Sequence, residues 1–133
     1  MHGDLTALAA RAVALHRQAE ESRATAREMH RRAGSADWRS VAGSAFAARL
    51  GRLGLEHLQA AGALDEAATA LEEHVRAVEH TQTLIAAAER WVTSLAAAAS
   101  ADDGVLPGLL RHLPSTGSPD WLDVAARLRT RGW

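Results

Sequence analysis

The stretch DWRSVAGSAFAARL, residues 37–50, decides the fold. It places a tryptophan, small residues and a glycine between two long segments whose apolar residues recur every three or four positions. That period is typical of amphipathic helices, and a short break between two such helices lets the chain reverse direction. The stretch therefore predicts the tip of an antiparallel helical hairpin.

Before the tip, one stripe of residues follows an unbroken alternation of three and four. Its members are mostly small or aliphatic: Leu5, Leu8, Ala12, Leu15, Ala19, Ser22, Ala26, Met29 and Ala33. A stripe of this kind packs against another helix, and its many alanines allow the two backbones to approach closely. Gly34 and Ser35 end the segment. We expect a first helix over about residues 4–34 and a turn over 35–41.

The same spacing resumes after the tip. The predicted stripe is Phe46, Leu50, Leu53, His57, Ala60, Leu64, Ala67, Leu71, His74, Val78, Thr81, Ile85, Ala88, Val92, Leu95 and Ala99. It indicates a second helix over about residues 42–100, much longer than the first. Pairing outward from the turn sets Leu5 opposite the neighbourhood of His74. The part of the second helix beyond Val78 then needs another partner for its apolar residues.

Glycine, proline and acidic residues break the pattern over residues 101–118, which we expect to form a loop. Ser118 as N-cap and Pro119 as first helical residue then begin a short helix over 119–131. This tail is basic and carries Trp121, so we expect it to fold back on the acidic second helix. The predicted fold class is all-α: a long antiparallel two-helix hairpin over 1–100 with a short C-terminal helix. Because two helices bury little apolar surface, we expect the hairpin to pair into a four-helix bundle.

Composition and charge exclude several functional classes. The chain has 133 residues, no cysteine, and arginine as its only basic residue apart from histidine, which fits a GC-rich bacterial coding sequence. Residues 1–55 carry nine arginines and five acids, 56–110 carry two and nine, and 111–133 carry four and two. The near-zero net charge that results argues against non-specific binding of nucleic acid. No apolar run is long enough for a membrane span, and Asp4 and Arg11 interrupt any cleavable secretion signal.

The sequence offers no set of catalytic or metal-binding residues. No two of the seven histidines are spaced i, i+4, and no Glu-x-x-His occurs. Phosphate-binding loops and nucleophile elbows are also missing. We therefore expect no enzyme activity, no cofactor and no metal. His57 and His74 lie on the predicted stripe, so we hypothesise that their protonation loosens the hairpin at low pH.

The turn carries a family resemblance, in which Trp38, Ser40, Gly43 and Phe46 form the turn motif. Trp38-Arg39-Ser40 between two helices, followed by Phe46 and Leu50, resembles the WXG-type helical hairpins exported by bacterial type VII (ESX) secretion systems. The stretches AATAL (67–71) and HVRAVEHTQ (74–82) resemble that family too. Two features depart from it: His74 stands where an aromatic residue is usual, and the export motif Tyr-x-x-x-Asp/Glu is missing.

The resemblance implies a non-enzymatic protein that acts through protein–protein contacts as a dimer. Its partner would be another helical hairpin, in a homodimer or heterodimer, together with the secretion machinery. It would be cytoplasmic before export and then secreted or cell-surface by a signal-peptide-independent route. The rival hypothesis is a cytoplasmic adaptor or oligomerisation module unrelated to secretion, and an alanine-rich coiled-coil hairpin outside the family remains open.

Two surfaces are candidates for these contacts. The expected partner interface consists of Leu50, Leu64, Leu71, Val78, Ile85, Trp91, Val92, Leu95 and Trp121. A basic tip, suited to an acidic partner, consists of Arg27, Arg31, Arg32, Arg39 and Arg49. The alternative for the basic tip is a solvated end of the hairpin with no partner.

Overall fold

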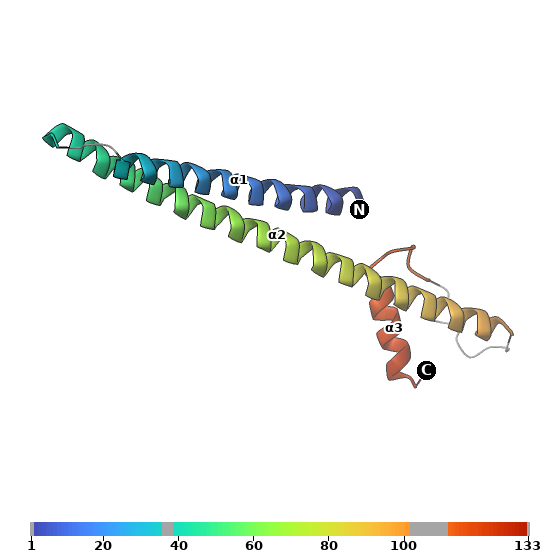
Figure 1. Ribbon diagram of the computed structural model, residues 1–133. Helices are drawn as coiled ribbons and strands as arrows, with labels where there is room; N and C mark the ends of the chain where they lie inside the picture. The colour runs from blue at the N-terminus through green and yellow to red at the C-terminus, as the bar shows by residue number, and fades with distance from the viewer. Residues whose placement is uncertain (1, 36–38, 102–111, 133) are drawn as a thin grey trace. The chain divides into compact units, whose positions relative to one another are not determined.

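The computed structural model describes residues 2–35, 39–101 and 112–132. Over these residues it has three helices and confirms the all-α prediction: α1 (His2–Ser35), α2 (Val41–Ala101) and α3 (Asp120–Thr130) (Figure 1). The chain divides into two compact units, Met1–Val75 and Arg76–Trp133, so α2 contributes to both. Unit 1 holds α1 and the first part of α2, and unit 2 holds the rest of α2 with α3.

In unit 1, α1 packs antiparallel along α2 through small residues spaced seven apart. The buried residues are Leu5, Ala12, Ala19 and Ala26 on α1 and Gly54, Ala61, Ala68 and Val75 on α2. A Cβ added to Gly54 would lie 3.6 Å from the Ala26 carbonyl oxygen, which fixes the register. The heptad spacing then sets Ala19 opposite Ala61 and Leu5 opposite Val75. In the three layers Ala12–Ala68, Ala19–Ala61 and Ala26–Gly54, only methyl groups or hydrogen separate the helices, so the backbones can approach to the lower end of the usual range of roughly 8–10 Å there.

The stripe predicted for α1 is confirmed at every position, because all nine of its residues are buried or half-buried. The stripe predicted for α2 is half wrong within unit 1, whereas in unit 2 its members Ile85, Ala88 and Val92 are buried. Its members Leu50, Leu64 and Leu71 are half-buried on the side of α1, but the alternating members are displaced by one residue. Gly54, Ala61, Ala68 and Val75 are buried in place of Leu53, Ala60, Ala67 and His74, all of which are exposed. The physical reason is size at Leu53 and His74, because the smaller Gly54 and Val75 fit the close contact. Ala61 and Ala68 follow from the same rotation of the helix, since they lie seven and fourteen residues after Gly54.

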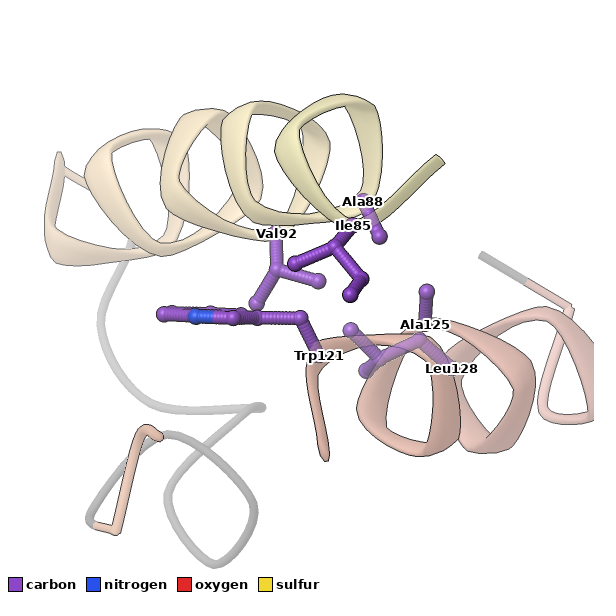
Figure 2. Packing of buried hydrophobic residues seen from close by; sticks show 6 residues of the cluster. All are labelled: Ile85, Ala88, Val92, Trp121, Ala125 and Leu128. Atoms are coloured by element: carbon purple, nitrogen blue, oxygen red, sulfur yellow. The ribbon is translucent and has the colours of Figure 1, made fainter. Parts of the chain in front are cut away.

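In unit 2, α3 packs on the last part of α2 around a compact apolar cluster. Its buried members are Ile85, Ala88 and Val92 from α2 and Trp121, Ala125 and Leu128 from α3. Figure 2 shows Ile85 and Val92 pointing from α2 toward α3. The three α3 residues recur at intervals of four and three, as an amphipathic helix requires.

The segment before α3 is held by specific hydrogen bonds. The Trp121 indole N–H donates to the carbonyl oxygen of Ser115 at 2.9 Å. The amide of Gly117 donates to the Glu89 carboxylate of α2 at 3.2 Å, and its φ of 79° lies in the left-handed region that favours glycine. The Ser118 hydroxyl accepts from the amide of Asp120 at 3.2 Å. The helix begins at Asp120, with Pro119 as N-cap, one residue later than the sequence predicts.

Candidate protein–protein interface

The start of α2 carries most of the large apolar side chains that the structure leaves exposed. Within residues 41–58 five of them are between 38% and 90% exposed; we call this set the tip-proximal apolar surface, made of Val41, Phe46, Leu53, Leu55 and Leu58. Phe46 and Leu53 are seven residues apart and so lie on the same side of α2. We call the buried residues Gly54, Ala61, Ala68 and Val75 the seam of α2. Leu58 lies on the other side of this seam from Phe46 and Leu53. The surface therefore flanks the α1 contact on both sides.

The turn motif is partly visible, since Trp38 lies outside the described residues. The Ser40 hydroxyl accepts a hydrogen bond from the amide of Gly43 at 2.9 Å. Ser40 thus caps the first turn of α2 and satisfies an amide that has no partner within the helix. Gly43 is half-buried, and Phe46 is 52% exposed. The motif therefore starts α2 and presents an aromatic ring to solvent one turn later.

The nine residues of the expected partner interface fall into two groups. Ile85, Val92 and Trp121 are buried in the cluster of unit 2, with Trp91 and Leu95 packed against it. The Arg129 guanidinium also lies over the Trp91 ring, 5.0 Å from its centroid. The remaining four are half-buried along α2: Leu50, Leu64, Leu71 and Val78. Ile85, Trp91, Val92 and Leu95 of α2 thus pack, in whole or in part, against α3 of the same chain.

The basic tip is largely neutralised by acids on its own helix. Glu28 accepts hydrogen bonds from Arg31 at 2.7 Å and from Arg32 at 2.9 Å. These two bonds, Arg31 first, lower the pKa of Glu28 to about 2. Arg27 pairs with Glu20 at 3.4 Å. The other two arginines of this set, Arg39 and Arg49, are exposed.

Sequence reasoning missed Val41, Leu55 and Leu58. The signal was present in the sequence, because Leu53, Leu55 and Leu58 are too many leucines, at the wrong spacing, for one stripe. Such an excess indicates a helix with apolar residues on more than one side. A helix in a bundle has this property, since it contacts two neighbours.

No group of three or more histidine, aspartate or glutamate residues in the described parts of the chain is placed to hold a metal ion. Over the same residues, none of the helices combines the length and apolar character needed to cross a bilayer. Comparison of the chain with protein-family models, curated proteins and solved structures finds no match.

Proposed function

We propose that this chain is a non-enzymatic helical-hairpin protein of the type VII secretion substrate and partner class, which acts by pairing with a second helical hairpin through the start of α2. The observation that carries the proposal is the tip-proximal apolar surface. Exposed groups of large apolar side chains mark sites of protein contact, and here they lie on both sides of the α1 contact. A hairpin partner fits because it offers long helices to both sides of α2, as in a four-helix bundle.

The link to type VII secretion rests on sequence resemblance. The Trp-x-Ser turn is followed by Phe46 and Leu50, and Phe46 belongs to the tip-proximal apolar surface. A cytoplasmic adaptor or oligomerisation module is the rival function. One observation favours it: the chain has no tyrosine and hence no Tyr-x-x-x-Asp/Glu export motif. As a type VII protein, this chain would leave the cell as the passenger of a hairpin partner that carries the motif.

Light scattering tests the pairing. We expect the 14.1 kDa chain to form a dimer, alone or after co-expression with a neighbouring hairpin protein. Phe46 and Leu53 are 52% and 38% exposed, so burial of the exposed part is worth about 1 kcal/mol each. The double variant Phe46→Ser, Leu53→Ser should therefore weaken pairing roughly thirtyfold. Val13→Ser is the matched control, because Val13 is an exposed apolar residue of α1 outside this surface.

A parent protein that stays monomeric in both preparations would contradict the pairing. So would a double variant that pairs as tightly as the Val13→Ser control. The link to secretion needs a separate measurement, namely the appearance of the protein in culture filtrate and its loss when the type VII ATPase is deleted. Pairing without ATPase-dependent export would favour the adaptor.

A further inference from the structure

One histidine of unit 1 lies between two carboxylates of the opposite helix. His16 is on α1, and its Nδ1 lies 2.8 Å from Oδ1 of Asp65 while its Nε2 lies 2.5 Å from Oε1 of Glu72. Asp65 and Glu72 are seven residues apart on α2 and so point to the same side of that helix. Arg23, on the next turns of α1, donates to the other oxygen of Asp65. Both contacts of His16 join helices that are distant in sequence.

The geometry determines the protonation state of the ring. A neutral imidazole has one N–H and one acceptor nitrogen, whereas ionised carboxylates only accept hydrogen bonds. Both ring nitrogens of His16 face such acceptors, so only the imidazolium can donate to both. In the neutral ring, one nitrogen lone pair would face a carboxylate oxygen at hydrogen-bond distance and repel it. The hydrogen bond to Asp65, and next the one to Glu72, accordingly raise the pKa of His16 above its ordinary value of 6.5.

The charges around His16 keep the Asp65 carboxylate ionised. From α2, Asp65 and Glu72 face the ring. From α1, Arg23 binds Asp65 and is itself contacted by Glu20 at 3.5 Å. The hydrogen bond from Arg23, followed by the one from His16, lowers the pKa of Asp65 below its ordinary value of 3.8. Asp65 thus remains an acceptor throughout the range in which His16 gains its proton.

We propose that His16, Asp65 and Glu72 form a pH-sensitive clasp that fastens α1 to α2 when His16 is protonated and releases when it is neutral. The sign follows from linkage. A histidine whose pKa is raised by folding contributes its full stabilisation below 6.5 and loses it as the pH rises through the raised value. The ionised Asp65 carboxylate contributes its full stabilisation above pH 3.8, and that stabilisation is lost only as the pH falls below this value. The clasp is therefore closed from about pH 4 to 6.5 and opens toward alkaline pH.

This direction is opposite to the sequence-based hypothesis for His57 and His74. His74 is exposed on α2, outside the contact with α1, and His57 is half-buried. Within the described residues, neither forms ion pairs like those of His16 with Asp65 and Glu72. Mild acidification is thus expected to tighten the hairpin. Because all the residues of the clasp belong to unit 1, the proposal does not depend on pairing with a second hairpin.

An NMR titration of the histidine rings in the full chain tests the clasp directly. We expect His16 to titrate above pH 6.5, with both ring nitrogens protonated at pH 6, and Asp65→Asn to shift that titration downward. A His16 titration at or below 6.5 in the parent would overturn the proposal. The titration of the parent needs no variant to fold.

Urea unfolding at pH 5.5 and pH 8, at one protein concentration, tests the effect on stability. The folding equilibrium constant of the parent should fall with rising pH, by up to about tenfold for each unit by which folding raises the pKa of His16. His16→Gln should remove that part of the dependence. His74→Gln, an exposed histidine of the same unit, should keep it. Equal pH dependence in the parent and in His16→Gln would exclude the clasp.

Discussion

Replacing Ala19 with leucine probes the close packing of α1 against α2. Ala19 and its register partner Ala61 are both fully buried. Leucine adds three carbon atoms where only methyl groups separate the two backbones. If there were room, burying these carbons would gain roughly 2.4 kcal/mol, at about 0.8 kcal/mol per methylene. The geometry instead predicts a loss.

To admit a leucine, the helices must move from the lower toward the upper end of the usual separation of roughly 8–10 Å. That movement would also open the neighbouring layers one heptad away, Ala12 with Ala68 and Ala26 with Gly54. Overpacking of this kind costs about 1–3 kcal/mol. We therefore expect Ala19→Leu to lower the free energy of unfolding by about 2 kcal/mol.

Urea unfolding followed by circular dichroism at 222 nm measures this change at fixed pH and protein concentration. Ala24→Leu, at an exposed position of the same helix, is the control and should change stability by no more than about 0.5 kcal/mol. A coiled coil with an ordinary leucine seam gains stability when a core alanine becomes leucine. An Ala19→Leu variant that is more stable than the parent would therefore refute the alanine-lined contact.

Two further predictions concern the same seam and the cluster of unit 2. Gly54→Ala should raise the free energy of unfolding, measured in urea, by about 0.5–1 kcal/mol, because glycine disfavours a helix interior. The added methyl group would meet Ala26 and Met29 at ordinary contact distances. A loss of stability would mean that the contact between the helices is tighter than described. Trp121→Ala should lower the free energy of unfolding of unit 2 by about 3–5 kcal/mol, because Trp121 is only 3% exposed. The loosened α3 should then be cleaved by trypsin after Arg127. Trp121→Phe should retain most of the protection, and equal cleavage of parent and Trp121→Ala would contradict the packing of α3.

The stripe of α1 could be predicted residue by residue because this helix has one apolar side and few competing leucines. The stripe of α2 could not, because a search for large apolar residues selects Leu53 over Gly54. The contact is instead made by the smallest residues, which bury best when two helices approach closely. A rule that matches the alanines of one helix with the smallest residues of the other would have found Gly54, and the heptad spacing from Gly54 would then have selected Ala61 and Ala68.

The clasp at His16 was hidden for the same reason. Asp65 and Glu72 reach across to α1 only when the seam of α2 contains Ala61 and Ala68. The sequence stripe kept Leu64 and Leu71 but placed Ala60 and Ala67 in the seam, a rotation of α2 that turns Asp65 and Glu72 away from α1. An error in the rotation of α2 thus conceals the contacts of His16 and Arg23 with Asp65 and Glu72, even when the hairpin itself is correctly predicted.

The misplaced stripe and the candidate interface have one physical cause. Because alanine and glycine occupy the seam, the backbones approach too closely for leucine or phenylalanine to fit between them. Phe46, Leu53 and Leu58 are consequently turned to the two sides of the seam, where α1 covers them only in part. Between them, the sides of α2 carry more apolar surface than one neighbouring helix can bury. The small residues that hold unit 1 together are therefore also the reason that α2 has apolar surface to offer to a second hairpin.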